Sequence, residues 1–322
     1  LPISVGIQLA IDTAWTTGIE KIVVPSGIYT IGGALDASSN SQIKIPSARQ
    51  GDANHSVYIT GTNPPNFDQQ GLLTMAPPTN GTIFNSTLKT SAAGIPAVFG
   101  SEAGNASDPV GWRWNYTNFG IERCGIRTKV SAGANKMSAL CLYNFAQTPH
   151  LDLLRIDVDQ ATTAMGSPTL ASYGIVLPPV NNHATMNAGL IYISGYNTGM
   201  TIEEHSCINN LIVVCCLTGI QINAGYHASR LGLYSAEFVR DCIKISGSQS
   251  VNIQTYDTEH NTGISWCAFN ADINYVAGNR KLTITHSHIV RQSVGIDDAA
   301  FTSNDANCYR ILFGAGANCG LP

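Results

Sequence analysis

Three carboxylate residues in the C-terminal half of the chain have the types and spacing that glycoside hydrolysis requires. Glu237 is followed, about one repeat of the chain later, by Asp257 and Glu259. Hydrolysis of a glycosidic bond uses two carboxyl groups, about 5 to 5.5 Å apart for retention of configuration or about 6.5 to 9.5 Å for inversion. Two like charges held this close also raise the pKa of one of them, which suits a general acid. We therefore expect Glu237, Asp257 and Glu259, the carboxylate cluster, to be catalytic.

Most other ionisable residues of this region lie close to the carboxylate cluster in the sequence, and one tyrosine lies among them. A row of such side chains on neighbouring repeats is what a groove for an extended sugar chain needs. The residues expected to bind substrate are Arg240, Asp241, Tyr256, His260, His288 and Arg291. The alternative interpretation is that the acidic residues are solvated turn residues that keep the chain soluble.

A second polar group, Glu203, Glu204 and His205, follows an apolar segment and could bind a cation. Adjacent residues of an extended chain alternate between faces, however, so these three side chains are not expected to converge. His227 stands alone in the sequence. No spacing of known zinc ligands and no phosphate-binding loop is present. The sequence therefore predicts neither a metal site nor a cofactor.

Two further groups of residues have both a structural and a functional interpretation. Asp152, Asp157 and Asp159 resemble an acidic calcium-binding run without its glycine spacing, and we expect them to flank a strand at the surface. Trp112 and Trp114 could stack on sugar rings, or they could pack an insertion onto the rest of the fold.

The elements that must position these residues repeat about every twenty positions between residues 190 and 298. Apolar pairs begin at Ile191, Leu211, Leu231 and Val251, and a longer insertion delays the next pair to Leu282. Each repeat reads as two short strands with period-two apolar positions, separated by a turn. Such units can bury their apolar faces only by stacking, so the pattern predicts a parallel β-solenoid.

Counting from those apolar positions places the candidate site on the solenoid. Glu237, Asp257 and His288 are each the sixth residue beyond the start of a repeat, so we expect them to form a column with about 4.8 Å between neighbours. The turns of these repeats lengthen, and we expect the ionisable residues to lie in the turns. A polar column is expected on the outward side of the second strands, formed by Thr201, Gln221, Lys244, Ser265 and Asp297.

The first thirty-five residues predict a helix and two strands. Residues 4–18 carry an apolar stripe at helical spacing, and Gly18 stands where the helix should end. The stripe consists of Ile7, Ala10, Ile11, Ala14 and Trp15. Strands are expected at residues 21–24 and 28–31. A helix at an open solenoid end would cover unpaired backbone and apolar core.

The segment GIQLAIDTAWTTGIEKIVVPSGIYTIGGAL, residues 6–35, resembles the opening of the pectate-lyase-like β-helix superfamily. Members of that superfamily begin with a short helix and then a V-P-x-G-x-Y-x-I strand pair. The resemblance implies an all-β fold, a single-stranded right-handed parallel β-helix with an N-terminal capping helix. The motif is specific for this fold and poorly specific for chemistry.

The superfamily includes polysaccharide lyases, galacturonases and bacteriophage tailspike depolymerases. Resemblance to the tailspikes implies hydrolysis of a bacterial capsular or O-antigen polysaccharide. A lyase acting on a uronic acid is an alternative, in which Arg240, Lys244 or Arg291 would neutralise the carboxylate and His260 would serve as the base. A non-catalytic β-helical receptor-binding or structural module is the other alternative, because a fold does not imply an activity.

Composition narrows the set of partners. Only 12% of the 322 residues are charged and the net charge is −4, without a basic run, so we expect no nucleic acid partner. No apolar stretch is long enough to cross a bilayer, so no membrane insertion is expected. The tailspike resemblance implies a homotrimer, in a phage tail or otherwise outside the cell. Outward apolar residues that need covering, expected at Ile212, Val214 and Tyr234, favour such an assembly.

We divide the chain into four parts: residues 1–35, capping helix and first rung; 36–120, early rungs with long insertions; 121–300, regular rungs; and 301–322, the end of the solenoid or the start of a further part. The chain reads as a fragment of a longer protein, because it starts at Leu1.

The nine cysteines contain no CxxC pair and are expected to be free thiols, although Cys308 and Cys319 could form a disulfide. Cys215 is expected to point into the core.

Overall fold

A computed structural model describes most of the chain. The described residues are 3–48, 56–67, 80–90, 92–102, 117–129, 136–143, 149–159, 172–177, 186–225, 227–247, 249–261, 269–277 and 282–292. The expected column positions Ser265 and Asp297, the tryptophans Trp112 and Trp114, and the cysteines Cys308 and Cys319 lie outside them.

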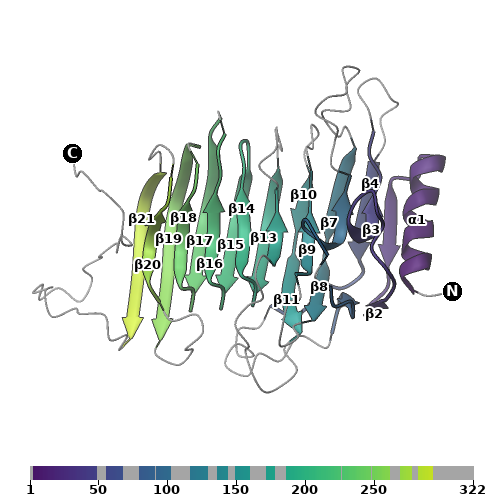
Figure 1. The fold of residues 1–322 in the computed structure, drawn as a ribbon, viewed down its shortest axis with the longest axis horizontal. Helices are drawn as coiled ribbons and strands as arrows, with labels where there is room; N and C mark the ends of the chain where they lie inside the picture. The colour runs from purple at the N-terminus through teal and green to yellow at the C-terminus, as the bar shows by residue number, and fades with distance from the viewer. Residues whose placement is uncertain are drawn as a thin grey trace, which may run out of the picture.

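The predicted helix is present as α1 (Ile3–Thr17). Its apolar stripe faces the strands: Ile11 and Ala14 are buried, and Ile7 and Trp15 pack against the same core. Gly18 follows the helix with φ +73°, in the left-handed region that favours glycine, which ends the helix as expected. In Figure 1, α1 lies at one end of the stacked strands.

The strands form two sheets. The 13-stranded sheet contains β1 (Lys21–Val24), β2 (Gly27–Ile31), β4 (Ser56–Gly61), β5 (Thr82–Ser86), β7 (Asn118–Glu122), β8 (Cys124–Lys129), β10 (His150–Asp152), β11 (Leu154–Asp159), β13 (Asn187–Ser194), β15 (Cys207–Val214), β17 (Ser229–Glu237), β19 (Val251–Asn261) and β21 (Leu282–Gln292). The 8-stranded sheet contains β3 (Ser41–Ile45), β6 (Ala97–Ser101), β9 (Ser138–Cys141), β12 (Tyr173–Val176), β14 (Thr198–Ile202), β16 (Thr218–Ile222), β18 (Asp241–Ile245) and β20 (Ala271–Tyr275). The strands predicted near residues 21–24 and 28–31 are confirmed as β1 and β2.

Successive rungs stack in parallel, so the strands follow one another along the long axis of the molecule (Figure 1). In the early rungs the larger sheet is interrupted: Arg123 separates β7 from β8 and Leu153 separates β10 from β11, each with positive φ. From β13 onward one long strand replaces the two short ones, since β13 pairs with both β10 and β11. This all-β arrangement of mostly parallel strands is consistent with the expected β-helix solenoid.

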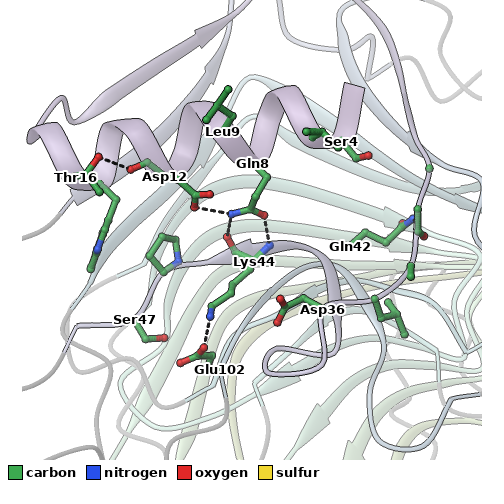
Figure 2. Close-up of a pocket in the computed structure, with 17 residues that line it drawn as sticks. Ser4, Gln8, Leu9, Asp12, Thr16, Asp36, Gln42, Lys44, Ser47 and Glu102 are labelled. Carbon is green, nitrogen blue, oxygen red and sulfur yellow. Dashed lines mark hydrogen bonds and ion pairs between the residues drawn. The ribbon is translucent and has the colours of Figure 1, made fainter. Parts of the chain in front are cut away.

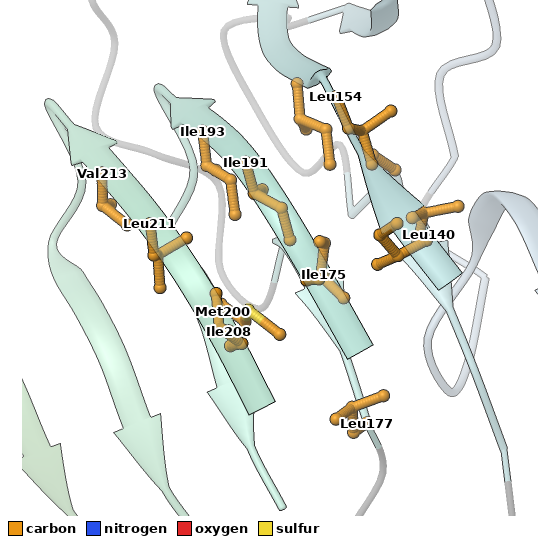
Figure 3. Packing of buried hydrophobic residues seen from close by; sticks show 14 of the residues in the cluster. Leu140, Leu154, Ile175, Leu177, Ile191, Ile193, Met200, Ile208, Leu211 and Val213 are labelled. Carbon is orange, nitrogen blue, oxygen red and sulfur yellow. The ribbon is translucent and has the colours of Figure 1, made fainter. Parts of the chain in front are cut away.

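The core lies between the two sheets and is built from inward residues at alternate strand positions. Ile191 and Ile193 of β13 stack on Leu211 and Val213 of β15, and Met200 of β14 faces them (Figure 3). All five side chains are fully buried. Burying one such side chain contributes about 1.5 to 3 kcal/mol, so the stacking of rungs is the main source of stability.

The predicted repeat of twenty holds for one step and is then wrong. Ile191 pairs with Leu211 as expected, but Leu211 pairs with Tyr234 rather than with Leu231. The turn between β16 and β17 is longer than the turn between β14 and β15, so β17 enters the sheet later along the chain. Leu231 in turn pairs with Ile253 rather than Val251. The first shift is three residues and brings Tyr234 to an inward position. The second is two residues and keeps the same side chains facing inward, so apolar alternation alone does not detect it.

The strands of the 8-stranded sheet, which are the second strands of the predicted repeats, keep the predicted register as far as β18. Ile220 pairs with Ile243, and Thr201, Gln221 and Lys244 are in register as expected, although Thr201 is buried with its hydroxyl bonded to the Leu177 backbone. The next strand of this sheet is β20, in which Ile273 pairs with Ile243 and Asn274 with Lys244, so Asn274 rather than Ser265 continues the column. No described helix is long and apolar enough to cross a membrane.

Candidate functional site

The long strands present one continuous row of side chains on the side of the larger sheet away from the core, which we call the outer face. Two in-register columns form it. One column contains Arg155, Tyr192, Ile212, Ser235, Asp257 and His288, and the other contains Asp157, Ser194, Val214, Glu237 and Glu259. Neighbouring positions are about 4.8 Å apart. The outer face thus brings together residues from six rungs.

The carboxylate cluster lies on the outer face, on β17 and β19. Glu237 is in register with Glu259, and Asp257 is in register with Ser235. The Ser235 hydroxyl lies 3.4 Å from Glu237 Oε1 and 3.3 Å from Asp257 Oδ2, and so bridges the two carboxylates. All three carboxylates therefore belong to one surface of two adjacent strands.

Exposure differs across the carboxylate cluster. Glu237 is only 8% exposed, the Asp257 side chain is 38% exposed, and Glu259 is exposed. His288, on β21, places Nδ1 2.8 Å from Asp257 Oδ1, and its own side chain is 63% exposed. The arrangement is therefore a buried carboxyl group beside a more accessible carboxylate that a histidine holds in place.

Two details of the predicted site are wrong. The carboxylate cluster and His288 were expected in turns, but they lie in β17, β19 and β21, because the strands continue past the apolar positions that mark them. Glu237 and Asp257 were expected at equivalent positions of adjacent repeats, but Glu237 aligns with Glu259. The two-residue shift between β17 and β19 causes this difference. The predicted alignment of Asp257 with His288 is correct.

Tyr256 was expected to bind substrate, and this is wrong. It points into the core, is fully buried, and stacks on Tyr234 with ring centroids 5.8 Å apart. Its hydroxyl donates to Asp272 Oδ1 at 2.8 Å. Tyr234 was likewise expected to face outward, yet it is the inward partner of Leu211. Both tyrosines are core residues because the register places them on the buried side of their strands.

The other expected substrate-binding residues are only partly tested. Arg240 is an exposed residue in the turn before β18. Asp241 begins β18, in the smaller sheet, where the Asn270 side-chain amide donates to its Oδ1 at 2.6 Å. His260 and Arg291 occupy paired positions on β19 and β21, and their side chains lie outside the described part of the structure. Their roles in substrate binding remain predictions.

At its other end the outer face carries a buried charged group. Arg155 Nε donates to Asp157 Oδ2 at 2.9 Å, and both residues are more than nine-tenths buried. The Arg155 guanidinium lies 4.7 Å from the centroid of the Tyr192 ring and donates to the Asn66 carbonyl at 2.6 Å. Asp157 was expected at the surface; it is buried instead, and burial raises its pKa against the opposing effect of Arg155.

A segment from the early insertions covers the apolar middle of the outer face. Phe67 packs with Tyr192 and Val214, and Ile212 belongs to the same cluster. Val214, expected to need covering by another subunit, is therefore fully buried within this chain. Cys215 joins this outer cluster rather than the core, since its positive φ of +50° turns the chain after β15. The expectation that Cys215 points inward is wrong.

A second polar site lies where the smaller sheet returns to the larger one. Glu204, His205 and His227, which we call the histidine corner, offer ligand atoms that all lie within 4.8 Å of one another. Glu204 and His205 lie in the turn between β14 and β15, and His227 lies in the turn between β16 and β17. The sequence does not reveal this site, because His227 is distant in sequence and Glu204 and His205 do not alternate as they would in a strand.

Glu203, next to the histidine corner, is 1% exposed. Burial raises its pKa to about 8, although the Asn223 side-chain amide, which donates to Oε1 at 2.7 Å, opposes the shift. The Glu203 backbone carbonyl accepts hydrogen bonds from the hydroxyls of Ser206 and Ser229. Glu203 thus anchors the turn from which Glu204 and His205 project.

A pocket of about 890 Å³ lies along α1 (Figure 2). Gln8 spans its wall: its amide donates to the Lys44 carbonyl at 3.1 Å, and its Oε1 accepts from the Lys44 backbone N–H at 2.8 Å. The Lys44 ammonium is paired with Glu102. These contacts join the helix to β3 and leave Lys44 and Glu102 engaged with one another.

Among the described residues, six cysteines are free, as the sequence predicted: Cys124, Cys141, Cys207, Cys215, Cys216 and Cys242.

Comparisons with protein-family models, with curated proteins and with solved structures give no match to this chain. The function must therefore be inferred from the geometry of the outer face and of the histidine corner.

Proposed function

We propose that the chain hydrolyses glycosidic bonds of a polysaccharide at the carboxylate cluster. The bridge that Ser235 forms between two carboxylates is the observation that carries the proposal. Because Glu237 Oε1 and Asp257 Oδ2 both lie within 3.4 Å of one hydroxyl oxygen, they are no more than about 7 Å apart. That separation is compatible with a pair of carboxyl groups acting on one glycosidic bond.

Burial and contacts suggest a role for each residue. Glu237 is the most buried of the three, and burial favours the uncharged form of a carboxyl group, so we assign it the proton donor. Asp257, more exposed and held by His288, is assigned the nucleophile or the base that activates water. Glu259, in register with Glu237, lies beside both and is the third carboxylate that can contact the sugar.

The surroundings of the carboxylate cluster suit a polymer. Exposed polar side chains precede the carboxylate cluster along β19 and β21, where sugar hydroxyl groups can form hydrogen bonds. These side chains belong to Asn252, Gln254, Thr283, Thr285, His286 and His288. Of the residues considered for a lyase mechanism, Lys244 lies on β18 in the smaller sheet, whereas His260 and Arg291 lie on β19 and β21, so a lyase reaction stays the alternative.

Other parts of the proposal rest on the resemblance of residues 6–35 to pectate-lyase-like proteins. They are the right-handed winding, the capping role of α1, a bacterial capsular or O-antigen substrate, a homotrimeric parent protein, and a location in a phage tail or elsewhere outside the cell. The apolar residues Val214 and Tyr234 no longer support a trimer, since both are buried within one chain. Light scattering at micromolar concentration tests the assembly; a monomer contradicts it.

The experiment for the activity is incubation of the chain with a panel of capsular and O-antigen polysaccharides. We expect at least one polymer to be shortened, with new reducing ends and without the ultraviolet absorbance of an unsaturated uronate. The appearance of that absorbance would replace hydrolysis by a lyase reaction. Binding without any shortening of any polymer would overturn the enzymatic proposal in favour of a receptor-binding module.

A further inference from the structure

We propose that Glu204, His205 and His227 bind a divalent transition-metal ion, with Zn²⁺ as the best fit. This site is independent of the proposed hydrolytic one: Ser229, beside His227, begins β17, whereas Glu237 ends it. The proposal rests on the convergence of a carboxylate and two imidazoles from two different turns, within 4.8 Å of one another.

The carboxylate of the histidine corner is already oriented. Glu204 Oε2 accepts the backbone N–H of His227 at 3.1 Å and lies 2.7 Å from His227 Nδ1. The His205 and His227 rings are stacked, with centroids 4.3 Å apart and planes 24° apart. In a tetrahedral zinc site with bonds of about 2.1 Å, the ligand atoms are roughly 3.4 Å apart. Rotations of the two rings that open the stack would bring the three ligand atoms onto one ion.

The turn that carries two of the ligands is held in an unusual conformation. His205 has φ +62°, a left-handed conformation that is uncommon for a non-glycine residue and that clusters at functional sites. The Ser229 hydroxyl accepts the Ser206 backbone N–H at 3.0 Å and donates to the Glu203 carbonyl, while the Gln249 amide donates to the same hydroxyl. These contacts from a neighbouring rung fix the turn, as outer contacts fix ligands in metal sites.

The ligand types select the ion. Two imidazoles and one carboxylate suit Zn²⁺ and similar first-row ions, whereas Ca²⁺ and Mg²⁺ prefer sets made of oxygen atoms. Glu204 is 4% exposed, and a buried carboxylate requires a compensating charge or hydrogen bonds. The His227 side chain is 54% exposed, so an ion can reach the site and keep a water ligand.

The test is equilibrium dialysis of the EDTA-treated, tag-free chain against micromolar ZnCl₂, with zinc measured per chain. We expect one equivalent of zinc, which excess Ca²⁺ or Mg²⁺ does not displace, and a Co²⁺ form with the visible absorption of a tetrahedral site. His227→Ala should weaken zinc binding about 100-fold or more, since loss of outer-shell partners alone costs about 10- to 100-fold. Glu204→Gln, which keeps the side-chain shape, should also weaken it.

His288→Ala is the matched control, because His288 is also exposed and also pairs with a carboxylate through Nδ1, at 2.8 Å. It should bind zinc like the unmodified chain. Zinc should raise the thermal midpoint of the unmodified chain and of His288→Ala but not that of His227→Ala, and the thermal transitions themselves show that the variants are folded. Binding of no zinc by the unmodified chain, equal loss in His288→Ala, or unchanged binding in His227→Ala would each overturn the proposal.

Discussion

Removing the acidic partner of the buried ion pair on the outer face should destabilise the protein more than removing its basic partner. In Asp157→Ala the Arg155 guanidinium is left buried, and arginine cannot lose its charge at accessible pH. Loss of one partner of a buried pair costs about 3 to 5 kcal/mol. In Arg155→Met the remaining carboxyl group keeps the charge of Arg127 nearby and can also take up a proton, which burial favours, so a smaller cost of about 2 kcal/mol is expected.

The double variant Arg155→Met with Asp157→Leu should recover only part of the loss, because the Arg155–Asp157 pair is removed as a unit while buried Arg127, in register with Asp157 on β8, keeps its charge. Urea unfolding followed by circular dichroism measures the three free energies, and their difference gives the coupling between the two sites. Lys21→Met is the control: it removes an exposed ion pair with Glu122 at 3.6 Å and should cost less than about 1 kcal/mol. A cost below about 1 kcal/mol for Asp157→Ala would show that the outer face is solvated there and that Asn66 does not cover it.

Three smaller predictions concern the core and the first rung. Tyr256→Phe should cost about 1 to 3 kcal/mol of unfolding free energy by removing the hydrogen bond to buried Asp272, without changing turnover of a polysaccharide, as activity assays can check. Gly219→Ala should cost about 1 to 3 kcal/mol, since the methyl group would overlap the Tyr234 hydroxyl; an unchanged thermal midpoint would contradict the packing there. Hydrogen bonds lower the pKa of Asp36, so Asp36→Ala should reduce stability at neutral pH, and the difference should vanish as pH falls below the lowered pKa.

The stacked-strand architecture could be predicted because it depends on local patterns. Period-two apolar positions such as Ile191 and Leu211 define strands wherever the chain is buried on one side. The helix stripe was equally clear, since Ile11 and Ala14 recur at helical spacing. The strands β3, β6 and β9 were missed because they are short and separated by long connections.

The register of the rungs could not be predicted, and the candidate sites depend on register. Tyr234 rather than Leu231 follows Leu211 because a turn lengthens, and turn length leaves no trace in the apolar pattern. A second shift, of two residues between β17 and β19, places Glu237 beside Glu259. His227 was missed for a related reason: it meets Glu204 only because two turns of successive rungs are stacked.

The most direct test of the proposed function is the rate at which the carboxylate variants shorten the polysaccharide that the unmodified chain shortens most. Glu237→Gln and Asp257→Asn should each lower the rate of reducing-end release by about 100-fold or more, because each removes a proton donor or a charge that the reaction uses. Glu122→Gln, a carboxylate on β7 away from the carboxylate cluster, should keep the full rate. Full rates for both cluster variants, or no shortening by the unmodified chain, would contradict the proposed function.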